Sequence, residues 1–242
     1  MKEKYKHSRE DQLDTSPERI VPMLISMFKP SSVADVGCGV GNWLFEFKKN
    51  KVNDLLGIDG FHMDKNLFML EQSQLHITNM DEPFSLPRKY DMAISLEVAE
   101  HLRKDSADMF IACLCNLSDT IIFSAAIPGQ GGQNHVNEQW PSYWKEKFES
   151  NGFMFQDIIR PVIWNDEKIR YWYKQNMFVA TRHPLPKNTM ENRIMDVMHP
   201  EMLAVKMAES FNGEFGIRRA LKALLNSIRL AVRHKLGMNR NV

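Results

Sequence analysis

Short apolar runs alternate with longer amphipathic stretches through the middle of the chain, between about residues 31 and 181. The short runs have the length and composition of buried strands, and the stretches between them have the spacing of crossover helices. Parallel strands need such connections, so the alternation predicts an α/β fold with helices on both faces of its sheet. The expected sheet is seven-stranded and mainly parallel, with strands over residues 33–36, 54–58, 74–77, 90–96, 120–125, 153–159 and 176–181.

The segment ahead of the first strand carries a helix-start signal. Residues 15–18 read Thr-Ser-Pro-Glu, which offers capping hydroxyls, a proline for the first turn and an early carboxylate. This order predicts a helix that runs to about Phe28. Residues 1–30 are therefore expected to form an N-terminal helical cover over one face of the sheet.

The chain changes character after the last expected strand. Residues 183–186 read His-Pro-Leu-Pro, which interrupts regular structure and separates a main domain over residues 31–183 from a C-terminal extension over residues 184–242. Within the extension, residues 217–236 place Leu, Ile and Val at helical spacing among six Lys or Arg and no acid. The extension is therefore expected to be helical and basic.

Several partners suit this basic amphipathic helix. An anionic membrane surface attracts nearby Lys and Arg, so peripheral membrane contact is one reading. Packing on its own domain or on a second subunit, as in a homodimer, is another. Contact with RNA is a third and weaker reading.

Composition excludes several classes of protein. The chain has 43% hydrophobic and 25% charged residues and a formal net charge of +1, which is ordinary for a globular protein and unlike a disordered chain or a polycation for nucleic acid. Cys38, Cys113 and Cys115 have no metal-knuckle spacing and no exporting leader precedes them. We expect a cytoplasmic protein, either free or peripheral on the inner face of the membrane.

The strongest local motif follows the first expected strand. Asp35 precedes three alternating glycines, Gly37, Gly39 and Gly41, and a helical pattern then begins. Glycines let a ligand lie against the backbone, and the start of a helix supplies unpaired N–H donors. A dinucleotide fingerprint would require glycine at Asn42, so the spacing favours another nucleoside cofactor, although a nicotinamide oxidoreductase is an alternative.

This motif resembles the first motif of class I S-adenosylmethionine (SAM) dependent methyltransferases, and the resemblance covers about residues 31–181. It implies a Rossmann-like methyltransferase sheet. It also implies that Asp59, at the end of the second strand, binds the ribose hydroxyls, that Asp81 holds the adenine amino group, and that the fourth strand lies beside the methionine moiety. The implied cofactor-binding residues are Asp35, Gly37, Gly39, Gly41, Asp59, Asp81 and Ser95.

A second group of chemically active residues follows the fourth strand. If residues 97–101 are helical, Glu97, Glu100 and His101 project from one face, and His135 in the glycine-rich loop after the fifth strand could join them. This arrangement is similar to that of small-RNA 3′-terminal 2′-O-methyltransferases, in which two carboxylates and two histidines hold a divalent ion. Further histidines of that family's second site are missing here.

The group allows three interpretations. Glu97, Glu100, His101 and His135 could bind Mn²⁺, Fe²⁺, Zn²⁺ or, less suitably, Mg²⁺. Alternatively, His101 or His135 acts as a metal-free base, with Glu100 setting the histidine tautomer, or Glu100 and His101 are structural. We name His101, His135 and Glu100 as candidate catalytic residues.

Two aromatic segments flank this region. Trp140, Tyr143 and Trp144 could line a sugar site, but their helical spacing favours the core. Residues 163–176 mix aromatic and charged side chains and could form a substrate lid, with Trp172 and Asn176 as contacts.

The loop and its following aromatic residues resemble those of bacterial methyltransferases of sugar and polysaccharide pathways. The resemblance implies O-methylation of a hydroxyl on a small-molecule or glycan acceptor. An RNA ribose 2′-O-methyltransferase and a non-catalytic SAM-binding module are the alternatives.

Overall fold

A computed structural model describes residues 14–61, 65–185, 196–211 and 217–235 of the chain. The chain divides into two compact units, Met1–His199 and Pro200–Val242. The boundary lies after His199 rather than at residue 183, because Gln175 binds the following segment. Its side-chain amide donates to the Val197 carbonyl at 2.6 Å, and its side-chain oxygen accepts from the main-chain N–H of His199.

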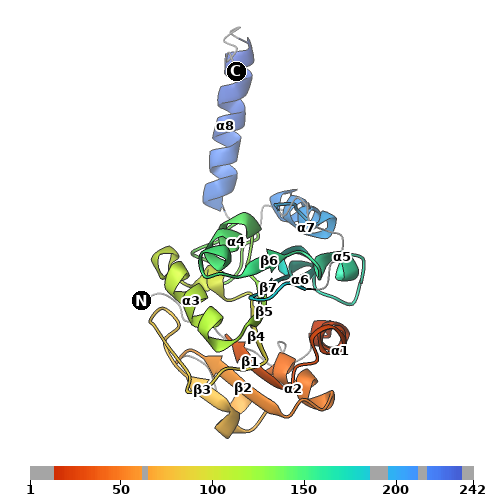
Figure 1. The fold of residues 1–242 in the computed structure, drawn as a ribbon. Helices are drawn as coiled ribbons and strands as arrows, with labels where there is room; N and C mark the ends of the chain where they lie inside the picture. Colours follow the sequence, from red (N-terminus) through yellow and green to blue (C-terminus); the bar gives the residue numbers. More distant parts are fainter. Residues whose placement is uncertain (1–13, 62–64, 186–195, 212–216, 236–242) are drawn as a thin grey trace. The chain divides into compact units, whose positions relative to one another are not determined.

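The first unit is built on a seven-stranded sheet with the order β3-β2-β1-β4-β5-β7-β6 (Figure 1). All neighbouring strands are parallel except β7, which is antiparallel to both β5 and β6. The strands are β1 (Ser32–Val36), β2 (Asp54–Asp59), β3 (Leu75–Ile77), β4 (Met92–Leu96), β5 (Thr120–Ser124), β6 (Met154–Gln156) and β7 (Phe178–Thr181). The predicted Rossmann-like fold class is confirmed.

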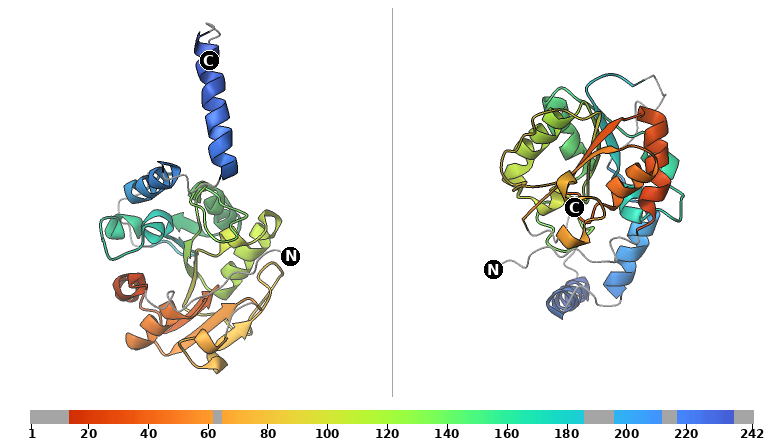
Figure 2. Two further views of the ribbon diagram at one scale, coloured as in Figure 1. Left: turned by 180° about the vertical axis from the view of Figure 1, so that it is seen from behind. Right: turned by 90° about the horizontal axis from the view of Figure 1, so that it is seen from below.

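Helices cover both faces of this sheet. On one face, α1 (Ser16–Phe28) and α2 (Asn42–Lys49) pack with α5 (Arg160–Ile163) and α6 (Tyr171–Asn176). On the other face lie α3 (Ala107–Leu117) and α4 (Pro141–Ser150) (Figure 2). Successive side chains of a strand point to opposite faces of the sheet, so the strands contribute apolar residues to the cores on both sides.

Strand β4 illustrates this alternation, because Met92 and Ile94 face the α1 side while Ala93 faces the α3 side. The α3 side contains a cluster of aromatic rings around Phe123, which contacts Trp144 at a centroid distance of 5.3 Å. Trp144 is 1% exposed, so the predicted core position is confirmed for this residue. Truncating a ring buried to this degree costs about 3–5 kcal/mol.

Several predicted strands are longer than the observed ones, and the sixth and seventh show why. The sixth was expected over residues 153–159, but it ends at Gln156 because the backbone turns into α5 at Arg160. The seventh was expected to begin at Asn176, which instead closes α6. Both segments place apolar residues at spacings that suit a strand or a short helix, and this ambiguity explains the error.

Thr15 occupies the N-cap position of α1 without a side-chain capping bond, and the Asp14 carboxylate binds the first residue of the helix instead. The Asp14 carboxylate accepts hydrogen bonds from the main-chain N–H and the hydroxyl of Ser16, at 2.9 and 2.6 Å. The Thr15 hydroxyl instead donates to the Lys168 carbonyl at 3.1 Å. The segment ahead of α1 is thereby tied to the chain just before α6.

The second unit contains α7 (Pro200–Phe211) and α8 (Ile217–Lys235). The predicted helix over residues 217–236 is therefore present over residues 217–235, and residue 236 lies outside the described part of the chain. In the part of the chain that the structure describes, no helix has both the length and the apolar character needed to cross a bilayer.

Candidate functional site

A cavity of about 820 Å³ opens at the carboxyl ends of the parallel strands. Its wall comes from the segments that follow β1, β2, β3, β4 and β5, together with the start of α6. Ligands of open α/β sheets bind at this edge, where the strand order reverses. Along the sheet order, the segments after β3, β2 and β1 form a glycine-loop end and those after β4 and β5 form an opposite end with carboxylates and imidazoles, while α6 adds aromatic rings.

Gly37 and Gly39 form part of the first end. Gly37 has a φ of +82°, and a Cβ placed on it would lie 2.3 Å from a methyl group of Val98. Any larger residue would therefore strain the turn and displace its neighbour. Gly41 has a different role: it lies outside the wall, and a Cβ there would be 2.6 Å from the Phe68 ring.

Asp59 lies in the wall beside this loop and is 2% exposed. Its carboxylate accepts the main-chain N–H of Gly39 at 2.7 Å and that of Gly60 at 2.6 Å. These two charge-assisted bonds fix the carboxylate and couple it to the glycine loop.

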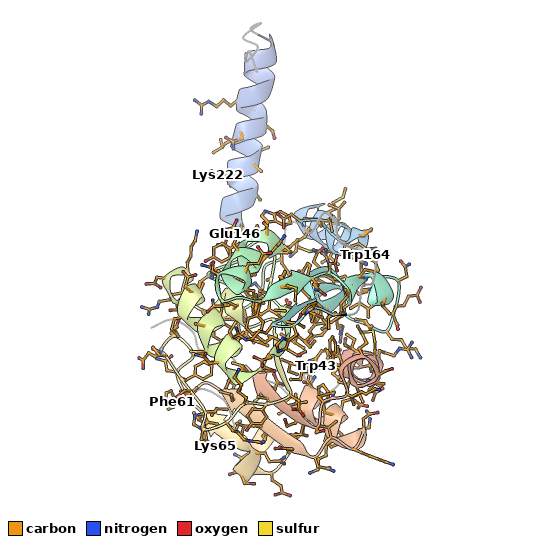
Figure 3. The ribbon with its side chains drawn as sticks, viewed as in Figure 1. Trp43, Phe61, Lys65, Glu146, Trp164 and Lys222 are labelled. Carbon is orange, nitrogen blue, oxygen red and sulfur yellow. The ribbon has the colours of Figure 1, made fainter. Side chains whose placement is uncertain are left out.

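Asp81 and Phe61 complete this end of the cavity. Asp81 accepts the main-chain N–H of Arg103 at 3.1 Å. Phe61 is 77% exposed and lies at the periphery of the first unit, whereas Trp43 lies in its interior (Figure 3). Sequence patterns did not single out Phe61; its place two residues after Asp59 was the available signal.

Asp35 and Ser95 lie behind the wall and do not line it. Both lie one residue inside the end of a strand and are buried, whereas the lining residues from the sheet lie at the strand ends or beyond them. Burial, together with the negative charge of Asp59, raises the pKa of Asp35 well above its usual value. The geometry gives Asp35, Ser95 and Gly41 supporting positions, and their cofactor contacts stay predictions.

At the opposite end, the predicted helical face of residues 97–101 is wrong. Glu97 follows β4 with a φ of +57°, and only Ala99–His101 forms a single 3₁₀ turn. The Glu97 carboxylate accepts from the side-chain amides of Gln130 at 2.7 Å and Asn176 at 3.0 Å. Asn176 is therefore a buried partner of Glu97 and does not line the cavity.

Glu100, His101 and His135 do come together. One possible ligand atom from each lies within 4.8 Å of the others. The two imidazole rings are perpendicular, with centroids 4.8 Å apart, and His135 Nε2 lies 3.9 Å from a Glu100 oxygen. The structure thus assembles three of the four predicted residues, and Glu97 stands outside this three-residue cluster.

The Glu100 carboxyl is fully buried, and neither oxygen has a hydrogen bond of ordinary geometry. Burial raises its pKa well above the usual value, and the charge of Glu97 raises it further. A buried carboxylate without a partner is costly, so this group favours a proton or a cation beside it. One carboxylate and two imidazoles are a donor set that fits a divalent transition metal.

Glu138 orients the second histidine. Its carboxylate accepts the main-chain N–H groups of Gly129 and Gly131 at 2.8 and 2.6 Å, and it lies 2.9 Å from His135 Nδ1. A proton shared on Nδ1 leaves Nε2 as the acceptor atom on the cluster side. Glu138 was missed from the sequence, where a carboxylate three residues after His135 was the only signal.

The start of α6 supplies the remaining wall. Tyr171, Trp172 and Tyr173 line the cavity with Trp43, whose ring stands edge-on to Tyr173 at 5.1 Å. Trp140, Tyr143 and Trp144 do not line it. Among the lining residues that the structure describes, the carboxylates are Asp14, Asp59, Asp81, Glu97 and Glu100, and Arg170 is the one Lys or Arg.

The family model described as "Methyltransferase domain" matches residues 5–154. The chain belongs to this family, and it is a SAM-dependent methyltransferase. No curated protein sequence matches the chain.

Solved structures share the fold. DesVI of Streptomyces venezuelae has a TM-score of 0.54 at 13% identity, covering 74% of this chain and all of its own. SAM-bound CalS10, an amino pentose methyltransferase from Micromonospora echinaspora, has a TM-score of 0.50 at 12% identity, covering 76% and 100%. The methyltransferase domain of bacterial CtHen1-C has a TM-score of 0.50 at 20% identity, covering 72% and 100%.

Proposed function

We propose that the chain transfers the methyl group of SAM to a hydroxyl of a sugar or glycan. The observation that carries this proposal is the cluster of Glu100, His101 and His135 in the wall opposite the glycine loop. A cavity with a nucleoside-binding end and an imidazole-carboxylate end has a place for each reactant.

The glycine-loop end fits SAM. Gly37 and Gly39 leave the backbone bare, and Asp59 presents a fixed carboxylate suited to a ribose diol. Phe61 offers an exposed ring for a purine, with Asp81 nearby in the wall as an acceptor for its amino group. Bound SAM supplies an electrophilic methyl group on a sulfonium, so the chain has mainly to align the acceptor and exclude water.

The cluster supplies what an alcohol acceptor needs. A hydroxyl remains protonated near neutral pH, so methyl transfer to its oxygen benefits from a base or a Lewis acid. His135 accepts a proton at Nε2 when Glu138 holds the Nδ1 proton. Glu100, His101 and His135 would also hold Mn²⁺, Fe²⁺ or Zn²⁺, and such an ion would lower the pKa of a bound hydroxyl.

The wall around the cluster favours a neutral sugar over a nucleic acid. Trp172 offers an aromatic face of the kind on which a sugar ring packs. Arg170 is the one guanidinium among the described lining residues, so the wall offers a polyphosphate chain little positive charge. A terminal RNA ribose is the second candidate, because the spacing of Glu97, Glu100 and His101 with a later histidine is similar to that of the small-RNA enzymes.

The test is transfer of labelled methyl from SAM into glycan-enriched and RNA-enriched fractions of a cell extract. We expect a base-stable methyl ether in the glycan fraction, lost in His135→Asn and retained in the matched surface variant His76→Asn. A chelator should abolish transfer and Mn²⁺ restore it if the cluster works with a metal. Transfer into RNA alone supports the second candidate, and SAM binding without transfer to any fraction contradicts an enzymatic role for this cluster.

A further inference from the structure

The helix α8 carries an unbroken apolar row. Its large apolar side chains recur at intervals of three and four residues, so they share one face, and each is at least half exposed. The members described are Ile217, Leu221, Leu224, Leu225 and Ile228. A helix with such a face is stable in water only when something covers that face.

Basic residues lie beside this row. Lys222 and Arg229 are exposed and seven residues apart, which places them on one side of the helix; Figure 3 labels Lys222 on α8. Residues 217–235 include six Lys or Arg, and no Asp or Glu occurs anywhere after Glu214. The strong positive charge is thus local to α8, because the whole chain has a net charge of only +1.

We propose that α8 is a docking helix that lies in the surface of an anionic lipid bilayer. Its apolar row would enter the boundary of the acyl chains, while Lys222 and Arg229 remain with the phosphate headgroups. The helix is not apolar enough to cross a bilayer, so the expected orientation is parallel to the surface. This inference is independent of the methyl acceptor.

The charge pattern also decides between a bilayer and a second copy of the chain. Two copies of α8 that covered each other's apolar rows would bring basic flanks together with no acid on either helix to pair with them. Anionic headgroups instead neutralise these flanks, and each cation near such a surface strengthens binding. The absence of acids therefore favours lipid.

The experiment is flotation of the full chain with vesicles of phosphatidylcholine alone or with about one third phosphatidylglycerol. We expect binding to the mixed vesicles only, and weaker binding in high salt. Lys222→Gln with Arg229→Gln should lower the partition coefficient by about tenfold or more. The matched control, Lys48→Gln with Lys65→Gln, removes the same charge from exposed sites of the first unit and should bind normally.

A second pair of variants tests the apolar row. Leu221→Gln with Ile228→Gln should abolish binding, whereas Asn226→Gln with Ser227→Gln, on the same helix, should not. Circular dichroism checks that the helix content is kept. Equal binding of both vesicle types, no binding to either, or self-association that depends on Leu221 and Ile228 would overturn the proposal.

Discussion

Asp59 joins two tasks at the scale of a single residue, because it fixes two main-chain amides and lies in the cavity wall. Asp59→Ala should weaken SAM binding about 10- to 100-fold, since hydrogen bonds to a charged group contribute about 1.5–3 kcal/mol. Calorimetric titration measures the change. The exposed Asp105→Ala variant is the control, and equal SAM affinity in both variants would contradict the assigned role of Asp59.

Glu138 acts through His135 and not on a substrate directly. Glu138→Gln should lower kcat about 10- to 100-fold, as loss of an outer partner of a histidine does, because the ring loses its fixed orientation. SAM affinity should not change. Glu149→Gln, on the exposed side of α4, is the matched control. A fall in SAM affinity equal to the fall in kcat would show a general loss of structure instead.

Asp35 makes stability depend on pH. Burial and the charge of Asp59 raise the pKa of its carboxyl in the folded chain. Below the ordinary value of 3.8 the carboxyl is protonated in both the folded and the unfolded chain. Above that value the unfolded chain loses the proton first, so the free energy of unfolding falls as pH rises. Asp35→Asn should remove this loss and raise Tm at pH 8 by about 2 °C or more, with little effect near pH 3.

Asp54 offers a control in which the expected change in stability has the opposite sign. Arg88 lowers the pKa of the exposed Asp54, so Asp54→Asn should decrease stability slightly at neutral pH. Scanning calorimetry of both variants across pH compares the two effects. A Tm difference for Asp35→Asn that is the same at pH 3 and pH 8 would contradict the electrostatic explanation.

The family resemblance predicted Asp59 and Asp81, and residue types and spacing indicated Glu100, His101 and His135; all five line one cavity. Strand-end positions made this possible, because the carboxyl ends of parallel strands share one edge. Other positions depend on the backbone. Glu97 reaches Asn176 because its backbone is left-handed, and Glu138 reaches His135 because of the loop conformation. Neither feature produces a periodic pattern in the sequence.

At the scale of elements, α6 contributes aromatic rings to the cavity wall. The sequence indicated this segment only as part of a possible substrate lid over residues 163–176. Trp172→Ala should raise KM for the acceptor several-fold while SAM affinity stays unchanged, because the lost ring belongs to α6 and not to the glycine loop or the segment that carries Asp59. Trp164→Ala is the control, since Trp164 packs on His199 outside the wall. Steady-state kinetics would reject the idea if both substitutions changed KM equally.

The seven strands and their types could be predicted because each combines an apolar run with a turn signal. Their ends could not, as the end of β6 and the start of β7 illustrate: the apolar residues there suit a strand or a short helix equally well, and in the fold they lie at the start of α5 and the end of α6, which pack in the core with α1 and α2. The short 3₁₀ turn at Ala99–His101 has the same origin.

At the scale of the whole molecule, the cavity and α8 belong to different units. The described residues of the cavity wall all lie between Asp14 and Tyr173, within Met1–His199. A chain shortened to end at Phe211 should therefore keep its SAM affinity and its main thermal transition but lose vesicle binding. Calorimetry and flotation test this expectation, and a large fall in SAM affinity would show that the two units are energetically coupled.

The two ends of the cavity are carried by different stretches of chain, and this has an evolutionary consequence. The methyl-donor end depends on strand termini held by backbone bonds, which tolerate little change. The acceptor end includes the loop after β5, whose residues 131–134 are exposed, and exposed loops accept insertions and exchanges more readily than strand ends. Natural variation or a laboratory graft can therefore redirect such a protein to a new recipient molecule while its donor chemistry is inherited intact.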